Sequence, residues 1–200
     1  MNYPTFFDNT PIITLKDPLS DVLGTFEEGI VQFSYLDVVK SAGHSCPTVS
    51  GAYLCTLKAL DALYTNGLTP MRGDISVSFK SNAKEGVTGV IANVVTQITG
   101  ATEQTGFKGL NGKFARHSLM AFDANIGAEM SFKRKDTGKT VEVTYNPSSV
   151  PANPKMQELM GKLLQGAATP EEKKEFGELW QSRVEAIFKH ADEVVTVKEV

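Results

Sequence analysis

Two side chains that can bind a metal lie two residues apart in the stretch S-A-G-H-S-C-P-T-V-S-G, residues 41–51. The chain has three histidines and two cysteines, so His44 and Cys46 bring two rare residue types together. An imidazole nitrogen and a thiolate sulfur suit zinc, iron, nickel or copper. Because Pro47 favours the first position of a helix, we expect Cys46 to precede a helix, where free backbone N–H groups favour a thiolate. The stretch therefore predicts a transition-metal site or a reactive thiol.

A stable zinc site needs three or four ligands, and this stretch supplies two. His117, in K-F-A-R-H-S-L, is the candidate for a third ligand. We expect it on a strand over residues 114–122, which would bring it to the site if that strand passes the loop. The alternative is a half-exposed strand histidine beside Arg116. The candidate metal ligands are thus His44, Cys46 and His117.

Two other chemistries use the same residues. Haem iron accepts imidazole or thiolate as an axial ligand, so all three candidates could hold haem. Without a metal, Cys46 could be the catalytic nucleophile of a thiol enzyme, or a redox sensor, with His117 as the base. His44 is a poor base for Cys46, since neighbours on a short loop rarely face one another. Whether the protein is an enzyme or a non-catalytic accessory protein of a larger assembly stays open.

The remaining cysteine and histidine are expected to have structural roles. Free cysteine is among the most buried residue types, so Cys55 is predicted to lie in the core and to be inert. His190 lies near the end of the last expected helix, where a cation interacts favourably with the helix dipole.

Composition indicates the class of protein. The chain has 200 residues, of which 41% are hydrophobic, which suits one domain with a sizeable core. Its 20 basic and 23 acidic residues give a net charge of −3, which argues against a nucleic-acid partner. The N-terminal residues do not resemble a signal peptide, and no apolar stretch is long enough to span a bilayer. We expect a cytoplasmic protein that binds neither nucleic acid nor membrane.

Helix signals surround the candidate site. Asp17 followed by proline predicts a short helix over residues 18–23, and residues 29–33 predict a strand. Ser34 is expected to cap a helix over residues 35–41. Apolar residues at spacings of three and four then predict a long helix over residues 47–64. His44 and Cys46 would therefore lie on the connection between two helices.

Further along, alternating and apolar segments predict strands at 75–79, 114–122, 126–132 and 140–145, with a hairpin turn at 135–139. Residues 87–98 predict a buried helix, although their β-branched residues leave a strand possible. Glycines make residues 100–112 a loop. We expect one domain over residues 1–146 that contains both helices and strands.

The last quarter of the chain has a different composition. Residues 147–200 are predicted to form a proline-rich linker followed by two helices. The last of these carries a wide apolar stripe, namely Phe176, Leu179, Trp180, Val184, Ile187 and Phe188. Because such a stripe must be covered, we expect it to pack on the core or on a second protein chain.

The stretch G-H-S-C-P-T-V-S-G-A-Y-L resembles the G-H-x-C-P-G signature of the FmdE family, which is typified by a component of formylmethanofuran dehydrogenase. I-T-G-A-T at 98–102 and G-F-K-G-L-N-G-K-F at 106–114 look like the family's T-G-C-T-F-G-K-G-N segment with an insertion. R-K-D-T-G-K at 134–139 looks like its strand–turn–strand segment. The resemblance implies an α+β fold with a mixed β-sheet and helices packed on one face, similar to the catalytic domain of glyceraldehyde-3-phosphate dehydrogenase. It also implies a bound transition metal, usually zinc, and a homodimer.

The chain departs from the family pattern at three places. The cysteine of T-G-C-T is Ala101 here, and the aspartate that commonly precedes it by eight residues is Asn93. No cysteine follows Cys55, so the C-terminal zinc finger of many family members is missing. The usual third sulfur ligand is therefore absent, and His117 is predicted to replace it. By family analogy, a small-molecule substrate would belong to one-carbon chemistry or to the chemistry of molybdenum and tungsten enzymes.

Overall fold

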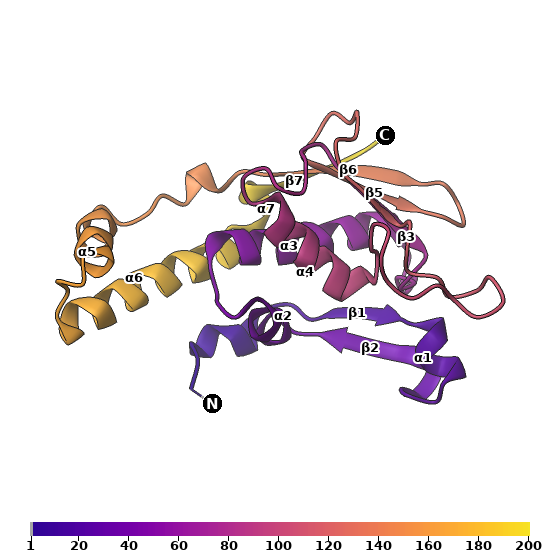
Figure 1. Ribbon diagram of the computed structural model, residues 1–200, viewed down its shortest axis with the longest axis horizontal. Coiled ribbons are helices and arrows are strands. Elements are labelled where there is room, and N and C mark those ends of the chain that lie inside the picture. The colour runs from indigo at the N-terminus through magenta and orange to yellow at the C-terminus, as the bar shows by residue number, and fades with distance from the viewer. Residues whose placement is uncertain (1) are drawn as a thin grey trace.

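The computed structural model describes residues 2–200 and arranges them in three layers (Figure 1). The first layer is a five-stranded sheet with the order β4-β3-β5-β6-β7. β3 is parallel to β4, and the other neighbours are antiparallel, so the sheet is mixed. Its strands are β3 (Ile75–Phe79), β4 (Met120–Ala121), β5 (Met130–Arg134), β6 (Thr140–Tyr145) and β7 (Val195–Glu199). The fold is α+β, as the sequence predicts.

The middle layer consists of α3 (Pro47–Leu63) and α4 (Thr88–Thr99), which lie side by side next to one face of the sheet (Figure 1). Proline at the first position starts α3, and its apolar residues, such as Tyr53 and Leu60, are fully buried. α4 ends at Gly100, whose φ of 76° gives the left-handed cap that favours glycine. The sequence left a strand possible over this segment, and the structure shows a helix.

The third layer is the hairpin of β1 (Ile13–Lys16) and β2 (Ile30–Phe33), on the other side of α3 (Figure 1). α1 (Pro18–Val22) connects the two strands, and the Asp17 side chain caps it as predicted. The hydroxyl of Tyr53 on α3 donates a hydrogen bond of 2.9 Å to the carbonyl of Phe33. The sequence predicts β2, whereas β1 was not expected.

The C-terminal segment returns to the core. α5 (Lys155–Leu164) and the first turns of α6 (Pro170–Lys189) extend away from the sheet (Figure 1). The second half of α6 packs on α3, where Val184 and Ile187 are fully buried, and β7 then pairs with β6. This chain's own core thus covers part of the apolar stripe. The division into residues 1–146 and 147–200 stays a prediction.

The remaining helices are short: η1 (Thr5–Asn9), η2 (Glu27–Gly29), η3 (Pro147–Ser149) and α7 (Ala191–Val194). Within residues 2–200, no helix combines the length and the apolar character that crossing a membrane would require.

The predicted strand over residues 114–122 is wrong, because only Met120 and Ala121 pair with the sheet. Phe114 and Ser118 have φ values of 64° and 57°, which a strand cannot accommodate. The backbone of Arg116 bonds across the glycine-rich loop instead, donating to the carbonyl of Phe107 and accepting from the N–H of Thr102. His117 therefore lies in a turn and not on a strand.

Candidate functional site

Residues 43–46 form the short connection between α2 (Tyr35–Ala42) and α3. α2 begins with a capping box between Ser34 and Asp37, so the predicted cap by Ser34 is confirmed. It ends at Gly43, whose φ of 77° reverses the chain. Because Pro47 already starts the next helix, the loop has little freedom, and both flanking helices fix the positions of His44 and Cys46.

α6 also holds this loop. The indole Nε1–H of Trp180 donates to the carbonyl of Ser45 at 2.9 Å, and the amide of Gln181 donates to the same oxygen at 3.3 Å. The hydroxyl of Ser45 donates to Oε1 of Gln181 at 2.9 Å and accepts a bond of the same length from Tyr35. Sequence reasoning did not find these two α6 residues. The apolar stripe that includes Trp180 was the only sign that α6 has a partner.

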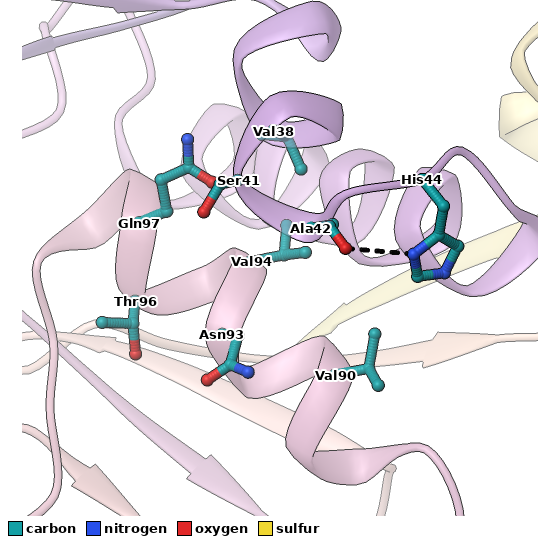
Figure 2. Close-up of a pocket in the computed structure, with 9 residues that line it drawn as sticks. All are labelled: Val38, Ser41, Ala42, His44, Val90, Asn93, Val94, Thr96 and Gln97. Atoms are coloured by element: carbon teal, nitrogen blue, oxygen red, sulfur yellow. Dashed lines mark hydrogen bonds between the residues drawn. The ribbon is translucent and has the colours of Figure 1, made fainter.

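The ring of His44 is exposed, and a single hydrogen bond orients it. Its Nδ1 lies 3.0 Å from the carbonyl oxygen of Ala42, shown as a dashed line in Figure 2. A carbonyl can only accept, so Nδ1 carries the proton and the lone pair of Nε2 is left open. A backbone carbonyl that fixes the tautomer in this way is the usual support of a metal-ligating histidine.

His44 lies on the wall of a cavity of about 530 Å³ between α2 and α4, which we call the His44 cavity. Its other lining residues are Val38, Ser41, Ala42, Val90, Asn93, Val94, Thr96 and Gln97. Figure 2 shows Asn93 on α4 among the residues that line this cavity. The lining contains no lysine, arginine or carboxylate, so the cavity offers neutral polar groups, apolar surface and one imidazole.

Cys46 has different surroundings from His44. It is buried in the core, with 9% of its surface exposed, and it does not line the His44 cavity. Its Sγ accepts the N–H of Val49 at 3.4 Å and so caps α3, and the predicted position of Cys46 just before a helix is confirmed. The two side chains are therefore only two residues apart in sequence but lie in different environments.

Gly51, near the end of the stretch that resembles the family motif, has a packing role. The hydroxyl of Tyr145 on β6 donates to the carbonyl of Pro47 at 2.8 Å, so its ring lies across the first turns of α3. A Cβ added at Gly51 would approach that ring to 2.5 Å. Glycine is therefore required at position 51 for the sheet to pack closely on α3.

The other titratable candidates lie elsewhere. His117, in the turn before β4, has its Nδ1 2.9 Å from the hydroxyl of Ser118 and does not line the His44 cavity. Cys55 is fully buried, and burial raises the pKa of its thiol strongly, so the prediction of a core cysteine is confirmed. His190 ends α6, and its Nδ1 lies 2.8 Å from a carboxylate oxygen of Glu193.

The family model described as "FmdE, Molybdenum formylmethanofuran dehydrogenase operon" matches residues 42–197. The chain belongs to the FmdE family. The matched region begins just before His44 and ends in β7, so it includes α5 and α6 as well as the sheet. No curated protein matches the sequence significantly.

The donor set of this FmdE chain fits a metal in one respect and not in another. The imidazole of His44 is oriented, exposed and open at Nε2. However, among residues 2–200 no group of three or more His, Cys, Asp or Glu side chains is placed to hold an ion. A zinc site completed by the residues as they stand does not fit this arrangement, because closed sites have four protein ligands and open ones three.

Proposed function

We propose that this FmdE-family protein binds a transition metal, with zinc as the first candidate, through Nε2 of His44 on the wall of the His44 cavity. The observation that supports this proposal is the hydrogen bond from Nδ1 to the Ala42 carbonyl, which fixes the tautomer that a metal requires. Iron, nickel and copper are the alternative metals, since imidazole suits them as well. The metal, when bound, supplies a Lewis acid or a redox centre.

The rest of the cavity would bind a small molecule that completes the coordination. Asn93, Thr96 and Gln97 supply neutral polar groups, while Val90 and Val94 supply apolar surface. Such a lining favours a small, polar, uncharged ligand and supports the proposed role in small-molecule chemistry. The lining residues would hold this molecule, and any conversion of it would depend on the bound metal.

Cys46 and His117 remain proposed ligands of the same metal. Cys46 is close along the chain, but its sulfur would have to leave the N–H of Val49 to reach the cavity. His117 would have to approach from the turn before β4. A homodimer offers a second route to further ligands. The assembly we propose is a cytoplasmic one, in which this protein accompanies an enzyme of the formylmethanofuran dehydrogenase type.

Elemental analysis with an absorption spectrum tests the metal proposal. The untagged protein should contain about one metal ion per chain, and His44→Ala should lose it. His190→Ala is the matched control, because it removes an exposed imidazole that also bonds through Nδ1. Cys46→Ala and His117→Ala show whether these residues take part. An intense visible spectrum would indicate haem or iron in place of zinc. A folded wild type that takes up no metal from excess zinc, iron, nickel or copper, or equal metal content in His44→Ala, overturns the proposal.

A second candidate function is thiol chemistry at Cys46. The contact from the N–H of Val49 to Sγ supports it, because it holds the sulfur at the start of a long helix, where Cys46 is less deeply buried than Cys55. In the metal-free protein, iodoacetamide should label Cys46 before Cys55, as read by peptide mass spectrometry. Equal protection of both cysteines until the protein unfolds would argue against a reactive thiol.

A further inference from the structure

A second group of polar residues lies around Asp17, at the start of α1. Nη1 of Arg72 donates to one carboxylate oxygen of Asp17 at 2.9 Å, and Nη2 of Arg116 donates to the other at 2.6 Å. These residues are 55 and 99 positions away from Asp17 in the sequence. The Arg116 side chain is only 9% exposed. The structure thus holds two guanidinium groups on one carboxylate.

Backbone carbonyls take up part of the excess charge. Nε and Nη2 of Arg72 donate to the carbonyls of Ile98 and Gln97, at the end of α4, where the helix dipole is negative. Nη1 of Arg116 donates to the carbonyl of Arg72 at 2.7 Å. Each guanidinium has five N–H donors, so the recorded bonds leave donors for another acceptor.

Two glycines provide the space for this arrangement. A Cβ added at Gly73 would overlap the guanidinium of Arg116, and one at Gly100 would lie 3.1 Å from Cδ of the same side chain. Both glycines have positive φ, at 84° and 76°, so the backbone also favours glycine there. Positions 73 and 100 therefore require glycine so that the Arg116 side chain can lie close to the backbone.

Both arginines line a cavity of about 330 Å³ that we call the arginine cavity. Lys113, from the glycine-rich loop, and Lys135, after β5, line it too, and Asp74 is its only acidic lining residue. With Asp17 included, four cations face two carboxylates. Among residues 2–200, no ion pair joins either lysine to a carboxylate. In a chain of net charge −3, this cavity is a local excess of positive charge.

We propose that the arginine cavity binds a small molecule through an oxyanion group, a carboxylate or a phosphate. Each guanidinium group is planar, and its N–H donors match the paired oxygens of such anions. The two lysines add positive charge at the rim of the cavity without a fixed geometry. The side chain of Phe114, also in the lining, offers an apolar contact for the rest of the molecule. The site is separate in chemistry from the His44 cavity, whose lining includes no lysine or arginine.

Isothermal titration at fixed ionic strength tests this site, with inorganic phosphate and citrate as separate probes. Lys113→Gln with Lys135→Gln removes two rim charges without touching the buried arginines. Lys173→Gln with Lys174→Gln, on the exposed side of α6, is the matched control with the same change in net charge. We expect the wild type to bind one of the probes, the rim variant to bind it at least about tenfold more weakly, and the control to bind it like wild type.

Whichever probe binds more tightly assigns the carboxylate or the phosphate class. His44→Ala should bind the anion like wild type, which separates this result from the metal proposal. The proposal is overturned if neither probe binds, if both lysine pairs weaken binding equally, as non-specific attraction would, or if His44→Ala abolishes binding.

Discussion

The His44 cavity and the arginine cavity both involve the last turn of α4, yet they are built differently. The side chain of Gln97 lines the first, and its carbonyl accepts a hydrogen bond from Arg72, which lines the second. The His44 cavity is lined by uncharged groups, and one backbone bond orients its imidazole. The arginine cavity depends on buried charges with several bonds each. Substitutions of the buried charges beside the second cavity should therefore affect folding, whereas substitutions of His44 or Asn93 in the first should mainly affect ligand binding.

The largest expected effect comes from Asp17→Asn. It leaves the buried guanidinium of Arg116 without its carboxylate, and breaking a buried pair in this way costs about 3–5 kcal/mol of unfolding free energy. Urea denaturation measures the loss. The control is Asp192→Asn, which removes the exposed partner of Lys58 and should leave the urea midpoint unchanged. Similar losses in the two variants would mean that burial does not distinguish these pairs.

Gly73→Ala should come next. Alanine at positive φ costs about 1–2 kcal/mol, and overlap with the Arg116 guanidinium adds about 1–3 kcal/mol of overpacking. Gly67→Ala isolates the backbone contribution, since Gly67 has φ of 77° and open space around it. The difference between the two thermal or urea midpoints measures how tightly Arg116 is packed. If Gly73→Ala and Gly67→Ala have the same midpoint, the Arg116 side chain moves away without cost and its position is not fixed by packing.

Acid should weaken the ion pairs between Asp17 and its two arginines. Burial alone would raise the pKa of Asp17, but the hydrogen bond from Arg72 and the charges of both arginines outweigh it, so the pKa lies below its ordinary value of 3.8. The resulting stability is therefore present above pH 3.8 and is lost as the pH falls through the lower folded value. The unfolding free energy of wild type should fall over this range, and Asp17→Asn should lack that component. If the unfolding free energies of wild type and Asp17→Asn change in parallel with pH, Asp17 is not the group responsible.

The smallest effects on stability are expected in the His44 cavity. His44→Ala should change the unfolding free energy by no more than about 0.5 kcal/mol, because the ring is exposed and makes one hydrogen bond. Asn93→Asp should be equally mild for folding. However, it places a carboxylate on the same wall as the imidazole, and zinc binding by titration should become tighter. A large loss of stability in either variant would show that this cavity is also part of the folding core.

Local signals in the sequence predicted the parts of the fold that local interactions decide. Ser34 and Pro47 marked the starts of α2 and α3, and the position of Cys46 just before α3 followed from the proline. Asp17 was predicted as a helix cap, but its two arginines come from distant segments and leave no local pattern. The strand predicted around His117 failed because loop hydrogen bonds and positive φ values override apolar alternation.

The candidate site was predictable in the same partial way. Rare residue types at positions 44 and 46, together with the family signature, marked the loop where the cavity lies. The opposite environments of the two side chains were not predictable, because they follow from the turn at Gly43 and from contacts with α6. Trp180 and Gln181 reach Ser45 from about 135 positions away, and no periodicity within α6 specifies that partner.

The contact between Trp180 and Ser45 also makes the loop accessible to intrinsic tryptophan fluorescence. The chain has one tryptophan, and its indole N–H bonds to the residue between His44 and Cys46. Intrinsic emission therefore comes from a single fluorophore attached to this loop, and its wavelength and intensity should respond when the Ser45 carbonyl moves or when a quenching ion arrives nearby. Binding at the loop can thus be followed in the unlabelled protein, in real time and at low concentration.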